Sequence, residues 1–329
     1  MVLLALAACV GASQTQTLLP AAASSYDYYS IGDLDAAAPA PREFGLMLMG
    51  GGDWAKGAFK WFNERTGHGR IVILRASGSD DLQNELFRDV GGLTAAETIV
   101  FHDRSAANDP RVLAIVAHAD GIFIGGGDQS NYVRFWKGTP LSAALDAHVR
   151  SGRPLGGTSA GLAILGAYSY GAMDGGSLDS ADGLANPTGP AVTLVSDFLH
   201  LRYLDQVITD SHFGARARLG RLIVFVARFA QQQQNTAITG IGIDESTALC
   251  VDSDGRGRVY TNVGGYAWLV RPQRFADVLE AGKPLEFHAV PVTGVGPASS
   301  INLRTFHVDH PAFNWLVDAV GGKVTHQEL

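Results

Sequence analysis

One serine lies between small residues at the end of a short apolar run, where an exposed nucleophile would be placed. The segment Gly157-Thr158-Ser159-Ala160-Gly161 fits the pattern G-x-S-x-G of a nucleophile elbow. Small neighbours permit a sharp strand-to-helix turn, and the free N–H groups of the next helix favour negative charge near the hydroxyl. Because a serine is a poor nucleophile at neutral pH, it needs a base and an acid that orients this base.

Candidates for the base and the acid appear later in the chain. His212 closely follows an apolar strand predicted at 207–209, and a histidine can take the serine proton and return it to a leaving amine. Asp244 and Glu245 lie in the middle of the apolar segment 240–249. Neighbours along a strand point to opposite faces, so only one of these carboxylates can face His212. The residues by themselves leave that choice open.

Another polar group follows a run of three glycines. The apolar strand predicted at 121–124 leads into Gly125-Gly126-Gly127-Asp128-Gln129. Ligands of parallel sheets bind at the carboxyl ends of the strands, so Asp128 and Gln129 could face a substrate. Asp128 could instead cap the helix that follows.

The order of apolar and amphipathic segments predicts an α/β fold. It indicates right-handed crossovers in a mostly parallel sheet with helices on both faces. The strands are predicted at 44–49, 71–74 and 121–124, and the helices at 55–66, 109–119 and 141–150. Beyond residue 258 the pattern turns to β, which predicts C-terminal β-hairpin additions and then a closing helix at 311–320.

Three further segments carry expectations. The long Gly- and Ser-rich stretch 168–190 is expected to be a functional loop, because idle loops of this length are uncommon in compact domains. The glutamine run 231–234 is interpreted as a polar connector. Gly50-Gly51-Gly52-Asp53-Trp54-Ala55 also satisfies the dinucleotide fingerprint, but Arg75 stands where an acidic residue would hold a ribose. A nucleotide-binding oxidoreductase is therefore an alternative.

Composition excludes several classes of function. The 329 residues are 46% hydrophobic and carry a net charge of −7, without a basic stretch, so a nucleic-acid partner is not expected. Two cysteines give neither a disulfide framework nor a zinc site. His307 and His310 are interpreted as a surface pair without a metal.

The N-terminal segment predicts export from a bacterial cell. Leu6-Ala7-Ala8-Cys9 ends a short apolar run and resembles a lipoprotein processing box, in which Cys9 becomes the lipid anchor. A plain secretory signal is the other export interpretation, and a misassigned start is the alternative to both. We expect an export signal and flexible tether at 1–41, a single domain at 42–329, and a periplasmic, outer-membrane or extracellular location.

Four motifs in this order resemble the cyanophycinase and dipeptidase E family of serine peptidases. They are 125–129, 156–161, 210–213 with the arginines that follow, and 242–248. The resemblance implies a fold like the class I glutamine amidotransferases, no metal or cofactor, and in many members a homodimer. Carried over residue by residue, it implies Ser159 as nucleophile, His212 as base and Glu245 as the orienting acid.

The resemblance also implies a peptide substrate with aspartyl or isoaspartyl bonds, which includes cyanophycin. The substrate-binding candidates are Gln129, Asp210, Ser211, Arg216, Arg218 and Arg221. Ser211 departs from the glutamine of the family pattern, which puts cyanophycin specificity in question. Backbone N–H groups of Ala160 and of Gly126 or Gly127 are the candidates for an oxyanion hole. The alternative function is a non-catalytic peptide or amino-acid binding protein with the same fold. For Arg218 and Arg221, the alternative to an ion contact with the substrate is a salt bridge within the domain.

Overall fold

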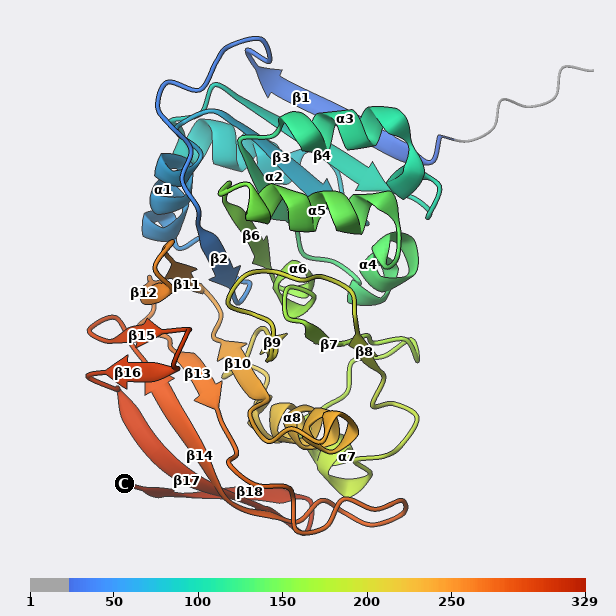
Figure 1. The fold of residues 1–329 in the computed structure, drawn as a ribbon, viewed down its shortest axis with the longest axis vertical. Helices are drawn as coiled ribbons and strands as arrows, with labels where there is room; N and C mark the ends of the chain where they lie inside the picture. The colour runs from blue at the N-terminus through green and yellow to red at the C-terminus, as the bar shows by residue number, and fades with distance from the viewer. Residues whose placement is uncertain (1–23) are drawn as a thin grey trace, which may run out of the picture.

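The computed structural model describes residues 24–329, which form two β-sheets with helices packed against them (Figure 1). The predicted lipoprotein box with Cys9 lies outside the described residues. The first sheet has the strand order β1-β4-β3-β5-β6-β2-β11-β12-β15-β16. Its strands are β1 (Tyr26–Gly32), β2 (Leu46–Met49), β3 (Arg70–Arg75), β4 (Ala95–Phe101), β5 (Gly121–Ile124), β6 (Leu155–Thr158), β11 (Thr247–Val251), β12 (Arg256–Thr261), β15 (Ser300–Asn302) and β16 (His307–Asp309).

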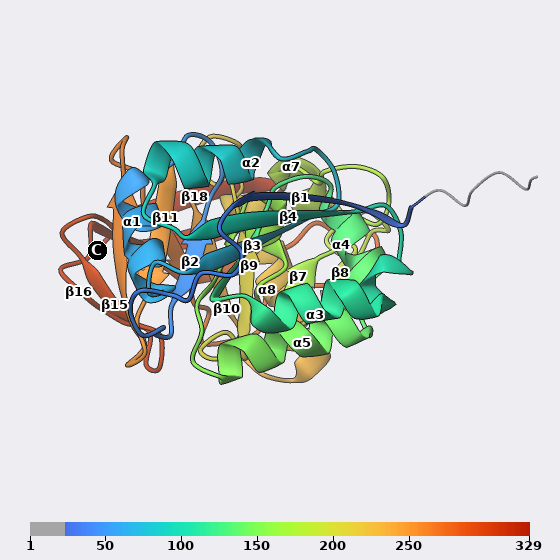
Figure 2. The same cartoon turned by 90° about the horizontal axis from the view of Figure 1, so that it is seen from above.

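The centre of the first sheet is parallel, as the sequence predicts. Strands β4, β3, β5, β6 and β2 run parallel to their neighbours, whereas β1 and β11 join this core antiparallel. Alternate residues of β2 enter two different apolar clusters, because successive side chains of a strand point to opposite faces. Helices therefore cover both faces, and Figure 2 shows α2 on one side of the strands and α3 and α5 on the other.

The helices follow the amphipathic segments of the sequence closely. They are α1 (Lys56–Arg65), α2 (Asp81–Asn84), the π-helix η1 (Glu85–Val90), the short 3₁₀ turn η2 (Ala106–Asn108), α3 (Pro110–His118), α4 (Gln129–Trp136), α5 (Pro140–Arg150), α6 (Ala160–Ala163), α7 (Ser180–Ala185) and α8 (Leu219–Gln233). Asp109 caps α3 as predicted, since its side chain accepts a hydrogen bond from the N–H of Arg111 and proline occupies the first turn. Within residues 24–329, none of these helices has the length and apolar character needed to cross a bilayer.

The second sheet has the strand order β18-β17-β14-β13-β10-β9-β7-β8. Its strands are β7 (Tyr168–Tyr170), β8 (Leu194–Ser196), β9 (Val207–Asp210), β10 (Thr239–Ile243), β13 (Ala267–Val270), β14 (Phe287–Val295), β17 (Phe313–Val320) and β18 (Lys323–Glu328). Strands β7, β9 and β10 are parallel, and the C-terminal strands add to them antiparallel. Helix α8 packs against this sheet in a second apolar cluster.

The predicted closing helix at 311–320 is wrong, because this segment forms strand β17. Phe313–Val320 pairs with both β14 and β18, so its backbone groups are satisfied within the sheet. Only alternate residues near its end, Val317 and Ala319, are fully buried, which is the period of a strand. The aromatic and β-branched residues of the segment suit a pleated surface, and tertiary pairing decides between the two structures.

Three other segments differ from their prediction. Tyr26–Gly32, expected in the tether, is an edge strand on β4, and the Tyr28 hydroxyl donates to Glu97 at 2.7 Å. The glutamine run is the last turn of α8, which ends where Gln234 adopts a left-handed conformation. The predicted loop 168–190 contains β7 and α7.

We expect Phe123→Ala to lower the free energy of unfolding by about 3–5 kcal/mol, the usual cost of deleting a buried aromatic ring. Phe123 is fully buried between the sheet and α1, with ring centres 5.2 Å from Phe59 and 6.1 Å from Phe62. Urea denaturation measures the change. Val263→Ala is the control because Val263 is 68% exposed, and a Phe123→Ala effect no larger than the control would contradict this packing.

Candidate active site

Ser159 lies on a strained turn between β6 and α6. Its backbone angles are φ 54° and ψ −118°, a conformation that side chains rarely adopt. A Cβ atom on Gly157 would lie 2.6 Å from the carbonyl oxygen of Gly161, so the turn excludes side chains on its inner side. The structure therefore contains the sharp strand-to-helix turn that the sequence predicts. Helix α6 has only four residues, which leaves individual N–H groups rather than a long helix dipole near the hydroxyl.

Ser159, His212 and Glu245 form a hydrogen-bonded row. Ser159 Oγ lies 2.7 Å from His212 Nε2, and His212 Nδ1 lies 2.6 Å from Glu245 Oε1. With Nδ1 as the donor to the carboxylate, Nε2 is free to accept the serine proton. His212 follows the carboxyl end of β9 and also adopts a positive φ of 48°. Three segments that are distant in the sequence thus meet at one point.

The choice between Asp244 and Glu245 follows from the turn that carries them. Both residues lie between β10 and β11 and not within a strand, so the alternation argument does not apply. The Asp244 carboxylate accepts hydrogen bonds from the N–H groups of Gly214 at 2.8 Å and Tyr266 at 2.9 Å, and from Trp268 Nε1 at 2.9 Å. Asp244 therefore anchors the turn, and Glu245 extends from it to His212.

The glycine turn after β2 supports His212, a role that the sequence analysis missed. Gly51 has a φ of 96°, and a Cβ atom there would collide with the imidazole ring of His212. The N–H of His212 donates to the carbonyl oxygen of Gly50 at 2.8 Å, and the N–H of Ser246 donates to that of Gly51 at 2.7 Å. The histidine ring thus occupies the space above these glycines, which argues against the dinucleotide interpretation. The only signal in the sequence was the position of this turn at a strand end.

A cavity of about 180 Å³ opens beside Ser159. Four of the predicted substrate-binding residues line this cavity: Gln129, Ser211, Arg216 and Arg218. The other lining residues are Gly127, Asp128, Ser159, Ala160, Tyr170, Ala172, Gly176, Ser177 and His212. Residues 170–177 come from the segment expected to be functional. Gln129 Nε2 donates to the carbonyl oxygen of Tyr170. This hydrogen bond connects the wall formed by residues 170–177 to the first residue of α4. Asp128 lines the cavity and also caps α4, where it accepts from the N–H of Ser130 at 2.9 Å.

Asp210 and Arg221 do not line the cavity, in contrast to their prediction as substrate-binding residues. Arg221 is 1% exposed, and its Nε donates to Asp210 at 2.8 Å. Arg218 extends from the same side and donates to the carbonyl oxygen of Ser211 at 2.7 Å. Because a buried ion pair is held by strong directional hydrogen bonds, Asp210 and Arg221 fix the segment before His212 from behind.

The candidate oxyanion residues lie close to Ser159. Gly127 and Ala160 line the cavity, and a Cβ atom on Gly126 would lie 3.2 Å from Cβ of Ser159. The buried Tyr132 hydroxyl donates to the carbonyl oxygens of Gly125 at 2.7 Å and Gly126 at 3.1 Å. These hydrogen bonds hold the glycine segment against the turn that carries Ser159.

The surroundings of His212 keep it neutral. Burial lowers the pKa of His212 below its usual 6.5, and the nearby cations Arg216 and Arg218 act in the same direction. The hydrogen bond to Glu245 opposes this shift and raises the pKa. Burial also lowers the pKa of Arg218 to about 10, so this side chain stays charged at neutral pH.

Metal-ligating side chains do not gather in the part of the chain that the structure describes. No group of three or more His, Cys, Asp or Glu residues stands within metal-binding reach there. His307 Nε2 lies 3.2 Å from Asp309 at the surface.

Comparison with known proteins gives consistent matches. The model for "Peptidase family S51" matches residues 46–258. A cyanophycinase of Synechococcus elongatus is 32% identical over 249 residues, which covers 73% of this chain and 71% of the relative. A cyanophycinase of Trichormus variabilis is 30% identical over 208 residues, which covers 62% and 63%. The crystal structure of a peptidase from an acI-B1 Actinobacterium aligns with a TM-score of 0.50 and 16% identity over 70% of this chain and 96% of that one, which concerns the fold.

The pKa of His212 is expected to rise in Arg216→Gln, because the cation of Arg216 disfavours the imidazolium form. Reaction of Ser159 with a fluorophosphonate requires neutral His212, so it is lost as the pH falls through this pKa. In the wild type the loss should lie below pH 6.5, and in the variant it should move to higher pH. NMR titration of the His212 ring and labelling rates across pH measure both values. An unchanged or lowered midpoint in the variant would contradict the assignment.

Gly51→Ala should slow fluorophosphonate labelling of Ser159 by about tenfold or more, because the new methyl group displaces the His212 ring by steric overlap. Gly91→Ala is the matched control. Gly91 also has a positive φ, 73°, but a Cβ atom there meets nothing within 4 Å. The control thus carries the backbone strain without the collision. Equal labelling rates in the two variants would show that Gly51 does not support the ring.

Proposed function

The chain belongs to peptidase family S51, and on this basis we propose that Ser159, His212 and Glu245 are the catalytic triad of this serine peptidase. The observation that supports this assignment is the continuous row of hydrogen bonds, 2.7 Å from Ser159 to His212 and 2.6 Å from His212 to Glu245. The lowered pKa of His212 adds to it, since a neutral imidazole can accept a proton at physiological pH.

The proposed reaction proceeds in two steps. Ser159 Oγ attacks the carbonyl carbon of the scissile bond while His212 takes its proton, and Glu245 stabilises the resulting imidazolium. His212 then gives the proton to the leaving amine, which leaves an acyl group on Ser159. A water molecule, activated by the same histidine, attacks the acyl group and releases the acid product. The N–H groups of Ala160 and of Gly126 or Gly127 stabilise the oxyanion of each tetrahedral intermediate.

The lining of the cavity supports a substrate with a carboxylate close to the scissile bond. Arg216 and Arg218 both line the cavity, and no carboxylate lies within 4 Å of Arg216 among the described residues. A guanidinium group suits such a partner because its N–H groups match the two carboxylate oxygens. We therefore assign the substrate to aspartyl or isoaspartyl peptides, a class that includes cyanophycin, from which the cyanophycinase relatives take their name.

Cleavage near the end of a chain is part of the proposal. The cavity beside Ser159, of about 180 Å³, is where the groups next to the scissile bond would lie. Ser211 is shorter than the glutamine of the family pattern, and it is 1% exposed beside Arg218. The pocket of this chain therefore differs from that of the family pattern at one wall, which bears on the choice between the polymer and short dipeptides.

A non-catalytic binding protein on the same fold is the alternative. It would need neither the strained backbone of Ser159 nor a histidine oriented by a carboxylate. Strain at both Ser159 and His212 is costly to the fold, and such strain is typical of sites that react.

Ser159→Ala should reduce the rate of peptide cleavage by about six orders of magnitude, because removal of a triad nucleophile leaves only binding and the oxyanion hole. The assay measures release of dipeptides from insoluble cyanophycin, and cleavage of a panel of isoaspartyl and α-aspartyl dipeptides. Ser196→Ala is the control, since Ser196 is an exposed serine on β8.

If the wild type cleaves the polymer and Ser159→Ala does not, the protein is a cyanophycinase. Cleavage of dipeptides alone would keep the triad and restrict the substrate class. Equal activity of Ser159→Ala and the wild type on every substrate would contradict the proposed nucleophile.

A further inference from the structure

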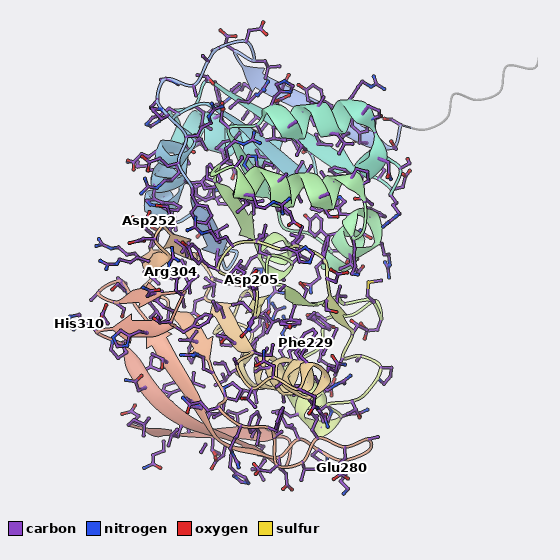
Figure 3. The ribbon with its side chains drawn as sticks, in the orientation of Figure 1. Asp205, Phe229, Asp252, Glu280, Arg304 and His310 are labelled. Atoms are coloured by element: carbon purple, nitrogen blue, oxygen red, sulfur yellow. The ribbon has the colours of Figure 1, made fainter. Side chains whose placement is uncertain are left out.

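A second groove, of about 470 Å³, lies outside the site described above. We call it the arginine groove and define it by Arg202, Tyr203, Asp205, Arg304 and Phe306, which line it. These residues come from the segment that precedes β9 and from the segment between β15 and β16. His212 follows the opposite end of β9, so the length of the strand separates the groove from the triad. Figure 3 labels Asp205 and Arg304 at about the mid-height of the molecule, with Arg304 toward the left.

Guanidinium groups stack on the aromatic rings of this groove. The Cζ atom of Arg202 lies 4.7 Å from the ring centre of Tyr203 and 5.3 Å from that of Phe44. The Cζ atom of Arg304 lies 5.0 Å from the same Tyr203 ring. Cation–π contacts at these distances hold a planar cation in place without consuming its N–H groups. Two positive charges are thus fixed on one tyrosine ring.

A third cation lies beside them. The Cζ atom of Arg271 is 4.9 Å from the ring centre of Phe306. Within residues 24–329, no carboxylate lies within 4.0 Å of the guanidinium groups of Arg202, Arg271 and Arg304. The ion pairs in this part of the chain are formed by other arginines. Asp205 lines the groove but does not pair with them, so the positive charge there exceeds the negative. In a chain with a net charge of −7, this is a local excess of unneutralised cations.

The backbone is strained where the rings are presented. Tyr203 has a φ of 73° and Phe306 a φ of 56°, and bulky side chains rarely adopt this left-handed region. Ser159 and His212 show the same kind of strain in the candidate active site. Such strain persists only where the surrounding structure imposes it, and it gathers at sites that bind or react. Both aromatic residues of the arginine groove carry it.

Free N–H groups remain in the groove. Arg202 is exposed and forms no hydrogen bond with residues 24–329, so all of its donors are available. Arg304 uses Nε on the carbonyl oxygen of Asp254 at 2.8 Å and one terminal nitrogen on the Tyr203 hydroxyl at 2.9 Å, which leaves its other terminal nitrogen. A planar fork of N–H donors matches the oxygens of carboxylate and phosphate groups.

We propose that the arginine groove is a binding site for a small anion that carries carboxylate or phosphate groups. One anionic group binds the open fork of Arg202, and a second reaches the free nitrogen of Arg304 across the Tyr203 ring. This inference does not rest on the proposed triad, because it concerns binding at another place in the fold.

Isothermal titration with citrate and with inorganic phosphate tests the site and separates the two chemistries. The wild type should bind at least one of the two anions. Arg202→Gln should weaken that binding by about tenfold or more, because the open fork is lost. Arg88→Gln is the matched control, since Arg88 is also exposed and also lacks an ion pair or hydrogen bond among the described residues. The heat of binding is measured without substrate, so the result does not depend on peptidase activity.

Two outcomes would overturn the proposal. One is the absence of binding of both anions to the wild type at about 10 mM, well above a millimolar Kd. The other is equal affinity in Arg202→Gln and Arg88→Gln. The double variant Arg202→Gln/Arg304→Gln, compared with Arg88→Gln/Arg150→Gln, should lose binding further. Arg202→Gln removes no hydrogen bond of the fold, only the cation–π contacts with Tyr203 and Phe44, so its melting temperature without anion should fall by about 4 °C at most.

Discussion

The imidazole ring of His212 packs directly on the backbone of Gly51, and the rest of the candidate active site depends on this contact. Gly51 follows β2 of the first sheet, whereas His212 follows β9 of the second. The contact therefore joins the two sheets at the place where Ser159 and Glu245 approach the ring. Only a glycine permits it, because any side chain at that position would occupy the space of the imidazole. The orientation of the imidazole ring is thus set by the backbone that follows a strand of the other sheet.

Groups behind the site hold this arrangement under strain. Ser159 and His212 both have positive φ values, which the surrounding structure must impose. The buried pair of Asp210 and Arg221 fixes the chain just before His212, and Asp244 ties the turn of Glu245 to β13 through Trp268. A buried ion pair contributes little to stability, but its geometry is fixed, because loss of either partner leaves a buried charge uncompensated. These contacts fit a role in positioning.

The C-terminal strands extend beyond the part of the chain that matches the family model, which ends at residue 258. They are nevertheless connected to the site, because Trp268 of β13 donates to Asp244 beside Glu245. The segment between β15 and β16 supplies Arg304 and Phe306 to the arginine groove. The same C-terminal region thus supports the turn of the candidate acid and contributes two of the five residues that define the arginine groove.

The sequence by itself determined the local parts of this protein. The G-x-S-x-G turn, the apolar strands of the parallel core and the Asp109 cap depend on neighbouring residues, so they could be predicted. The tertiary structure alone decided that 313–320 is a strand, because its pairing with β14 and β18 outweighs the local pattern. It also placed Glu245 against His212, a choice that the family resemblance implied but the residues by themselves left open. It buried Asp210 and Arg221 behind the cavity. Those choices depend on contacts between segments far apart in the chain, and the spacing of residues along a sequence carries no direct record of such contacts.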